Sequence, residues 1–365
     1  MSRLSEVLPR KLDLRLLALA LLLTLIGIAM VHSTTSGGPR GDLGAKQALW
    51  ALVGLGVAAA VLAVDYRILL QYSPGIYGLA MLVLLYLPLF GKRMVGAKSW
   101  IRLGAFQVQP SELTRIAIAL LLAWILENDD RAHVRNRTIW ILAGAVGLPM
   151  LLVLLQPDTG VALTYLPFVV AALFFGGMRA RWWILLIVTG ALAVGGSWFV
   201  LKDYQKDRIR TFLDPNLSVR GAGYQVRQAR IAIGSGGVFG KGWKQGTQSR
   251  LGFLPVRHTD FVFAALAEEW GFAGVAAFLG LFGAFVARAL TLARDARDRG
   301  GSMLVLLLVT NIACEALGNI AMNIGLLPTT GITLPFVSYG GSSLVATWAM
   351  TGLILSVAYR RFVNV

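Results

Sequence analysis

The sequence has very little of the chemistry that most disulfide and metal sites use. It contains one cysteine, Cys314, in 365 residues, so no disulfide can form within the chain. Its three histidines are scattered, and there is neither a CxxC nor an HExxH motif, so no zinc site is recognisable. Charged residues are also scarce, at 14% against about 25% in an ordinary globular domain. Such a chain lacks the polar surface that a soluble protein needs.

Apolar residues take the place of the missing charges and make up 56% of the chain. A helix needs about 20 apolar residues to cross a bilayer core. Ten stretches qualify approximately: 14–35, 45–64, 72–90, 111–127, 138–155, 160–176, 182–200, 261–288, 302–326 and 341–360. We therefore predict an all-α polytopic membrane protein with about ten transmembrane helices, forming a single transmembrane domain over residues 1–365.

Acidic residues are outnumbered, 18 against 34 Lys and Arg, which gives a net charge of +16. Such a charge suits anionic lipid headgroups, a phosphate-bearing substrate or nucleic acid. For a membrane protein we expect membrane lipids as partners and no nucleic acid. With an even number of crossings, sixteen basic residues fall on the side of the termini and six in the short loops opposite. Because basic residues favour cytoplasmic loops, both termini are expected in the cytoplasm, with the chain in the cytoplasmic (inner) membrane.

A long polar segment, residues 201–260, separates the seventh and eighth predicted helices. It carries eleven basic residues and four acids, a net charge of +7, and faces outward in this topology. One interpretation is a solvated loop that lies against lipid headgroups. The other is a site for an anionic substrate outside the membrane. Charge alone leaves both interpretations open.

Residues 234–243 of this loop are rich in glycine and imitate a nucleotide-binding loop. A P-loop needs glycine five positions before Gly240, where Ser235 stands, and Ser or Thr after the lysine, where Gly242 stands. ATP binding is therefore rejected. The segment is either a flexible turn or a run of backbone N–H groups that can approach a diphosphate closely, because glycine has no Cβ.

Ionisable residues inside the predicted helices are costly in lipid, so each is a candidate for function. Glu112 and Arg115 are three residues apart and can pair on one helix face. A structural ion pair explains them at least as well as catalysis does. Polar residues also recur at every fourth position of the ninth predicted helix, where interhelical hydrogen bonding is the simpler explanation and substrate contact the alternative: Asn311, Glu315, Asn319 and Asn323.

Two aspartates lie at the expected outer ends of helices. Asp158 is in a tight turn before the sixth helix, where turn chemistry alone favours Asp. Asp260 ends the basic loop and opens the eighth helix. Small residues follow it on one helical face, forming a groove that would fit a packed helix, which composition favours, or a lipid tail: Ala264, Ala267, Gly271 and Gly274. A carboxylate at the mouth of this groove, beside Arg257, His258 and Thr259, favours chemistry there.

Several segments resemble the SEDS family (shape, elongation, division and sporulation). They include 221–237, Gly240-Lys241-Gly242-Trp243, 246–249, His258-Thr259-Asp260-Phe261, 98–104, 109–112 and the signature 328–343. The resemblance covers nearly the whole chain, and it is closer to the elongation branch, RodA, than to the division branch, FtsW. Val256 stands where the family usually has Glu, and Arg115 stands where Lys is common.

The resemblance implies a peptidoglycan polymerase for cell elongation that joins lipid II units outside the membrane, by inversion and with release of polyprenyl diphosphate. It implies a class B penicillin-binding protein, a single-span transpeptidase, as partner. We expect Asp260 to be the catalytic base. Cationic candidates for the departing diphosphate are Arg208, Arg210, Lys241 and Arg250. Further expected substrate-binding residues are His258, Thr259, Lys98, Trp100, Gln109, Glu112 and Asp158.

No cofactor is evident from the sequence, and no ligand set for a metal, although a divalent cation could assist the diphosphate. Two functions of another class compete with the polymerase. A transporter that flips lipid II would place its polar residues near the membrane midplane, whereas here they concentrate at the outer face. A non-catalytic scaffold for the cross-linking partner is the other. A division-type, FtsW-like polymerase is the alternative within the family.

Overall fold

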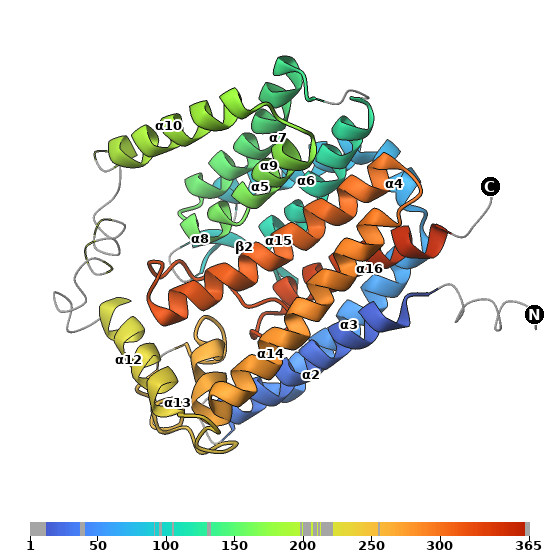
Figure 1. Ribbon diagram of the computed structural model, residues 1–365. Helices are drawn as coiled ribbons and strands as arrows, with labels where there is room; N and C mark the ends of the chain where they lie inside the picture. Colours follow the sequence, from blue (N-terminus) through green and yellow to red (C-terminus); the bar gives the residue numbers. More distant parts are fainter. Residues whose placement is uncertain are drawn as a thin grey trace, which may run out of the picture.

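The computed structural model describes residues 12–36, 41–90, 92–94, 97–103, 106–129, 133–197, 199, 206, 210, 212, 222–254 and 256–361. Much of the first half of the predicted external loop, including Arg208, therefore lies outside the described residues. The fold is mostly helical (Figure 1). Its helices are α2 (Leu14–Thr35), α3 (Gly44–Ala63), α4 (Tyr66–Gln71), α5 (Ser73–Phe90), α6 (Pro110–Glu127), α7 (Asn136–Leu155), α8 (Thr159–Leu163), α9 (Leu166–Phe175), α10 (Ala180–Ser197), α12 (Ala222–Ser235), α13 (Thr247–Arg250), α14 (Val262–Arg294), α15 (Arg299–Ile324) and α16 (Gly341–Arg360).

Each of the ten predicted stretches coincides with helical structure, but two of them are interrupted. The stretch 160–176 is divided into α8 and α9, because Pro167 stands in the first turn of α9 and cannot continue a preceding helix. The stretch 261–288 becomes α14, which has non-helical backbone angles at Gly271. The apolar pattern alone shows neither interruption.

Within the described residues, six helices are long and apolar enough to cross a bilayer: α2, α3, α7, α14, α15 and α16. Three further apolar helical segments are shorter, at Ser73–Leu87, Thr159–Phe175 and Ala180–Leu192. The helix α6 has a suitable length of 18 residues but carries Glu112, Arg115 and Glu127. The chain is therefore a multi-pass membrane protein.

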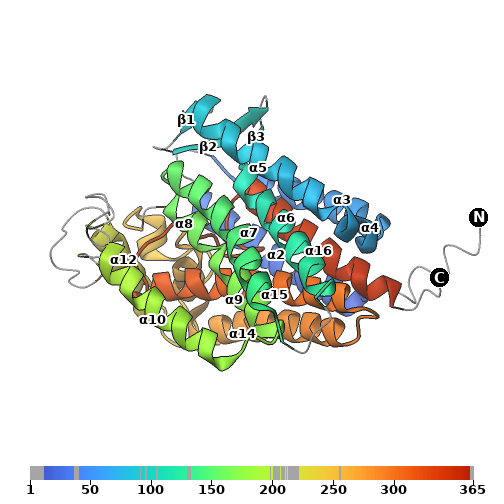
Figure 2. The same cartoon turned by 90° about the horizontal axis from the view of Figure 1, so that it is seen from above.

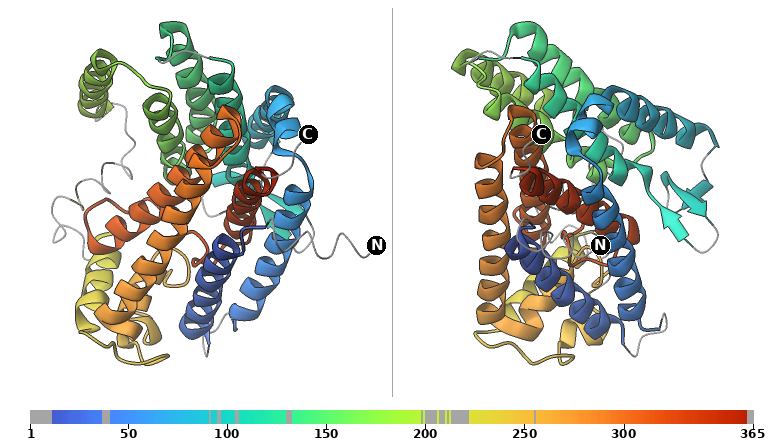
Figure 3. Two further views of the ribbon diagram at one scale, coloured as in Figure 1. Left: turned by 45° about the vertical axis from the view of Figure 1, so that its right-hand side comes forward. Right: turned by 90° about the vertical axis from the view of Figure 1, so that its right-hand side faces the viewer.

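A small antiparallel sheet forms in the segment 91–110, so the prediction of an all-α fold is wrong there. Its strands are β1 (Lys92–Met94), β2 (Ala97–Leu103) and β3 (Phe106–Val108), in the order β1-β2-β3. Ile101 pairs with Val108, and Lys92 pairs with Trp100. The segment is too polar for a bilayer and carries aromatic and β-branched residues that suit strands. Figures 2 and 3 show the sheet projecting from the bundle beside α5.

The start of α2 and the end of α16 lie at one end of the bundle, and α12 and α13 lie at the opposite end (Figure 1). Ion pairs join the segments that meet near the termini, since Arg288 of α14 pairs with Asp13 and Arg361 pairs with Asp295. The described part of the loop 201–260 and the residues next to the termini thus lie at opposite ends of the bundle.

The centre of the bundle is α16, whose residues from Leu344 to Ala358 are nearly all buried. It packs along α3 at close range, because Gly54 faces the ring of Trp348 and Gly352 faces the backbone of Ala58. Small residues allow two helix backbones to approach in this way. At its N-terminal end, α16 reaches the loop 328–340, which closes over the site described next.

Candidate active site

A cavity of about 420 Å³ opens where α6, α8, α15, α16 and the segment before α14 meet. Most of its lining residues have polar side chains, and they come from six parts of the chain: Ser99, Trp100, Gln109, Glu112, Pro157, Asp158, Val161, Thr164, Thr259, Asp260, Glu315, Gly331, Ile332, Thr333, Tyr339, Gly340, Ser342 and Ser343. The pocket thus brings together six of the residues expected from the sequence: Trp100, Gln109, Glu112, Asp158, Thr259 and Asp260. We call this cavity the central pocket.

Asp260 lies two residues before α14, and buried amides hold its backbone in place. Asn319 Nδ2 donates to the Asp260 carbonyl oxygen at 2.9 Å, and Asn323 Nδ2 donates to the same oxygen at 3.0 Å. Asn319 also donates to the carbonyl of Ile332 at 2.7 Å, which ties the loop after α15 to the same point. Both asparagines are fully buried. The polar stripe of α15 therefore positions the main chain at Asp260. Asn323 Oδ1 also accepts from the Ala264 amide of α14 at 3.1 Å, so interhelical hydrogen bonding is confirmed at this position.

Gly331 lies beside the Asp260 carboxylate. Gly331 has a φ of +77°, and a Cβ added there would lie 3.8 Å from Asp260 Oδ2. Gly331 therefore supplies a left-handed backbone turn beside the carboxylate, a conformation that glycine adopts without steric cost.

The segment 256–261 is also fixed by the loop 328–340. Ser338 Oγ donates to the Thr259 carbonyl at 2.6 Å, and the Tyr339 amide donates to the His258 carbonyl at 2.8 Å. The rings of Tyr339 and His258 have centroids 5.8 Å apart. Burial raises the pKa of Tyr339, so this phenol stays neutral in the physiological range. Thr259 and Tyr339 line the central pocket, whereas His258 does not and lies behind Tyr339.

A buried ion triad of Glu112, Arg115 and Glu315 lies beside the central pocket. Arg115 pairs with Glu112 one turn earlier on α6, which confirms the pair expected from their spacing. It also pairs with Glu315 of α15. Arg115 is fully buried, and both carboxylates are at least nine-tenths buried. Thr333 Oγ1 donates to Glu315 at 3.1 Å, so the triad continues into the loop before α16.

Another part of the pocket lining comes from the turn before α8 and from the sheet. Asp158 accepts a hydrogen bond from the Val161 amide at 3.2 Å, as the N-cap of α8. Its other oxygen accepts from Gln109 Nε2 at 3.0 Å. Trp100 contributes to the lining from β2. The turn chemistry expected of Asp158 is present, and it also places a carboxylate on the pocket.

Among the described residues, Arg210, Lys241 and Arg250 are not part of the central pocket's lining. Lys241 pairs with the buried Glu268 at 2.8 Å and bonds to Thr247 Oγ1 at 2.7 Å. Arg250 is exposed in the short helix α13, and Arg210 is exposed among otherwise undescribed residues. For Lys98 the structure places the backbone, in β2.

The glycine-rich segment forms a turn that fills the break in α14. The amides of Lys241 and Gly242 donate to the carbonyls of Glu268 and Glu269, each at 3.0 Å. Beyond the break, the Phe272 amide donates to the Gly237 carbonyl at 2.9 Å. A Cβ at Gly240 would overlap the Glu269 carbonyl, so glycine is needed for this approach. The segment is therefore a fixed structural element, and these two amides are already bonded within the chain.

The small-residue face of α14 is covered by α12 and by the glycine-rich segment. Ala264 packs in a small core with Ala229 and Ala232 of α12, and Gly236 lies against the backbone at Ala267. The packed-helix interpretation of this groove is confirmed, and the lipid-tail interpretation is wrong because the chain's own α12 and loop occupy it.

Sequence reasoning missed part of the pocket as a binding surface. Glu315 was recognised only as one polar residue of a stripe, and Thr333, Tyr339, Ser342 and Ser343 were recognised only as part of the family signature. A signal was present, because buried Ser and Thr near an ionisable residue of another helix point to a shared polar site. Within the described residues, no group of three or more His, Cys, Asp or Glu is arranged to hold a metal ion.

Comparisons with known proteins agree with one another. A family model described as cell cycle protein, FtsW/RodA/SpoVE, matches residues 13–362. The chain is 37% identical over 359 residues to a probable peptidoglycan glycosyltransferase FtsW of Trichlorobacter lovleyi, covering 95% of this chain and 93% of that protein. It is 36% identical over 350 residues to the peptidoglycan glycosyltransferase MrdB of Escherichia coli, covering 94% and 92%.

Solved structures show the same fold. The rod shape determining protein RodA of Thermus thermophilus superimposes with a TM-score of 0.73 at 30% identity, covering 97% of this chain and 98% of that one. A chain from a peptidoglycan synthase complex, whose structure is described as coordinating polymerization and crosslinking, gives a TM-score of 0.84 at 32% identity, covering 97% and 99%.

Proposed function

Because this chain belongs to the FtsW/RodA/SpoVE family of cell cycle proteins, we propose that its central pocket polymerises peptidoglycan precursors. The chain is a peptidoglycan glycosyltransferase, and lipid II is its proposed substrate. The observation that carries the proposal is Asp260, a carboxylate on the pocket whose main chain is held by two buried asparagines. Such fixed geometry is what proton transfer in a transition state requires.

The proposed reaction is a single inverting displacement. Asp260 accepts the proton of the acceptor sugar 4-hydroxyl while that oxygen forms a bond to C1 of the donor sugar. The bond between C1 and the phosphate oxygen breaks, and polyprenyl diphosphate leaves with the electron pair. Glycoside hydrolases need a second carboxyl group to protonate a poor leaving group, but a diphosphate leaves as an anion once cations neutralise it.

Other pocket residues hold the sugars in this scheme. Gln109 and Asp158 present a hydrogen-bonded pair, and Thr259 and Trp100 flank it on the pocket surface. Glu112 forms an ion pair with Arg115, and its proposed role is to maintain the shape of the pocket that receives the substrate. Arg208, Arg210, Lys241 and Arg250 remain proposed diphosphate contacts, of which Lys241 would have to leave Glu268 to serve. A divalent cation could assist them.

For the topology we propose ten transmembrane helices in the cytoplasmic membrane, both termini in the cytoplasm and the loop 201–260 outside. We expect a cysteine at Gln245, exposed in this loop, to react with an impermeant maleimide on intact cells. The background is Cys314→Ala, which removes the natural cysteine. The matched control, Arg137→Cys at the end of the bundle near the termini, should react only after permeabilisation. The reverse pattern would overturn the orientation.

We further propose that a single-span class B penicillin-binding protein is the partner that cross-links the product. The likeness to a chain of a peptidoglycan synthase complex supports this proposal. We assign the chain to elongation, although the relatives include both an FtsW and a MrdB protein.

The function is tested with purified protein and fluorescent lipid II, with and without the co-purified penicillin-binding protein. Polymer on a gel is the expected result. Movement of lipid II across a vesicle membrane without polymer would favour the transporter. Neither polymer nor movement, in both preparations, would favour the scaffold.

A further inference from the structure

The central pocket is poorly suited to a diphosphate. Four carboxylates line it, from Glu112, Asp158, Asp260 and Glu315. The guanidinium of Arg115 is already paired with two of them. A diphosphate anion placed there would meet like charges in surroundings that screen them weakly. The sugars suit this pocket, and the phosphates need a cationic site beside it.

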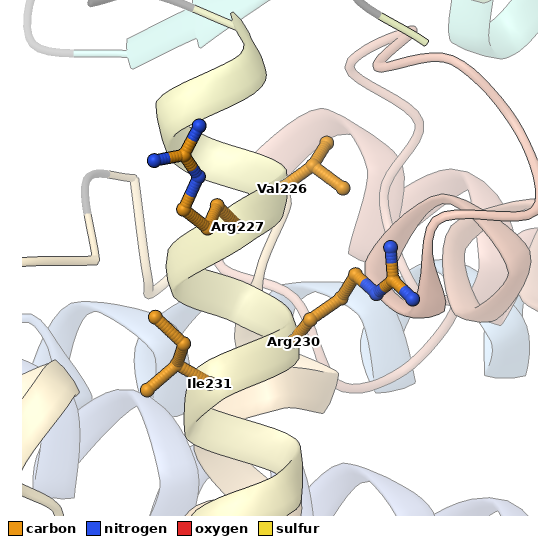
Figure 4. Close-up of a pocket in the computed structure, with 4 residues that line it drawn as sticks. All are labelled: Val226, Arg227, Arg230 and Ile231. Carbon is orange, nitrogen blue, oxygen red and sulfur yellow. The ribbon is translucent and has the colours of Figure 1, made fainter. Parts of the chain in front are cut away.

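A second cavity, of about 250 Å³, lies on α12 and is lined by Val226, Arg227, Arg230 and Ile231 (Figure 4). The two arginines are three residues apart, and each is four residues from an apolar side chain, so cationic and apolar groups share the lining. Figure 4 shows Arg230 extending toward the end of α15 and Arg227 extending along α12. We call this site the arginine cradle.

The sequence on both sides of the cradle is cationic. Residues 215–259 include seven Lys and Arg and no acid. Within the part of the chain that the structure describes, no hydrogen bond or ion pair engages the Arg230 guanidinium. Its stem lies against Gly325, the left-handed cap that ends α15. A free guanidinium held this way is ready to bind an anion.

The cradle is also close to Asp260 through the fold. Ala229 and Ala232 of α12 pack against Phe261, the residue after Asp260. On its other side α12 contacts α15, whose Asn323 holds the Asp260 carbonyl. The same α12 therefore carries the two arginines and supports the main chain beside the proposed base.

Apolar side chains next to the cradle indicate a membrane surface. Ile324, Leu326 and Leu327 at the end of α15 are 37%, 67% and 45% exposed, and Ile231 is 44% exposed. Exposed aliphatic side chains beside arginines are typical of the lipid headgroup region.

We infer that the arginine cradle binds the phosphate group of a membrane lipid, and that it holds the polyprenyl-linked diphosphate while the attached sugars occupy the central pocket. The inference rests on the proposed function, because the ligand that spans both sites is a polyprenyl-linked sugar. The Arg230 guanidinium can form charge-assisted hydrogen bonds to a diphosphate, Arg227 adds positive charge on the same helix, and the apolar rim accepts the start of the chain. Anionic phospholipid has the same phosphate chemistry and is the other source of ligand.

The competing explanation is that Arg230 only complements the negative end of the α15 helix dipole. In that case either cation, Lys or Arg, serves equally at position 230, and no lipid affinity depends on position 227. Both points are measurable.

The experiment measures lipid binding to the purified full-length chain by native mass spectrometry, without turnover. The probes are undecaprenyl diphosphate, phosphatidylglycerol and phosphatidylcholine. We expect Arg227→Gln/Arg230→Gln to weaken binding of at least one anionic probe by about tenfold or more, since charged hydrogen bonds are lost. Phosphatidylcholine should bind unchanged. The control is Arg137→Gln/Arg294→Gln, which removes two exposed arginines at the opposite end of the bundle.

The anionic probe that weakens identifies the source of the phosphate. Equal binding by the Gln pair and the parent for both anionic probes would overturn the inference, as would an equal loss in the control. If Arg227→Lys/Arg230→Lys retains most of the binding of the anionic probes, positive charge at these positions is what binds the phosphate. The same measurement on Asp260→Asn separates the two proposals. Asp260→Asn should keep arginine-dependent binding while it loses polymerisation. Arginine-dependent binding by a parent chain that makes no polymer would refute the function and leave the cradle in place.

Discussion

Asp260→Asn is expected to lose polymerisation of lipid II by at least two orders of magnitude, within the range of about 10²–10⁴-fold that general-base catalysis contributes. The substitution keeps the side-chain volume but removes the negative charge and most of the basicity. The hydrogen bonds from Asn319 and Asn323 go to the main-chain carbonyl, so they are unaffected. The measurement is polymer formed per minute from fluorescent lipid II, with thermal unfolding as a check on folding.

A structural role for this aspartate makes the opposite prediction. If Asp260 only arranged the turn before α14, asparagine would serve as well, because both residues favour turns and helix starts. Activity within a few-fold of the parent would therefore refute the assignment. Asp158→Asn is the useful comparison, since Asp158 lies on the same pocket but caps α8. We expect the Asp158 variant to lose less activity than the Asp260 variant.

Arg115→Gln is expected to produce the largest loss of stability in the chain. Removing one partner from a buried ion pair costs about 3–5 kcal/mol, because the remaining charge stays buried without compensation. Here two carboxylates, Glu112 and Glu315, would face each other beside the pocket. Thermal unfolding of the purified protein should begin at a clearly lower temperature, and polymer formation should fall with it.

Arg115→Lys is the matched control for this effect. Lysine keeps the positive charge but cannot bond to two carboxylates through a planar fork. We expect it to recover most of the unfolding temperature and part of the activity. If the Gln variant unfolded at the parent temperature and polymerised normally, the triad would have no supporting role in the pocket.

Apolar run length predicted the helices well, because a bilayer imposes nearly the same requirement on every crossing. It did not predict the sheet at 92–108 or the interruption of α14. In the sequence, Gly271 looks like the other small residues on its helix face. Its non-helical backbone angles go with a close contact to Gly240. That contact joins residues 31 positions apart in the sequence. Local patterns contain no information about such long-range pairing.

The sequence predicted the pocket residues of the candidate site better than it predicted its basic residues. Trp100, Gln109, Glu112, Asp158 and Asp260 were identified by motif or by position at a helix end, and the fold brings them to one pocket. Lys241 was chosen for its charge, but charge does not show which partner a side chain faces. The buried Glu268 that pairs with it lies 27 residues later, inside a helix. For basic residues in a long loop, only the tertiary arrangement separates those that pair internally from those that remain available.

The interruption of α14 also determines the depth at which the chemistry takes place. A continuous helix of 33 residues would be about 50 Å long, much longer than a hydrocarbon core of about 30 Å. The 23 residues from 272 to 294 measure about 34 Å and match the core without the first part. The nine residues before the break are therefore not needed to cross the lipid and can stay level with the outer headgroups. In the proposed topology, Asp260, which precedes them, would meet the proposed lipid-linked substrate in the water outside the membrane.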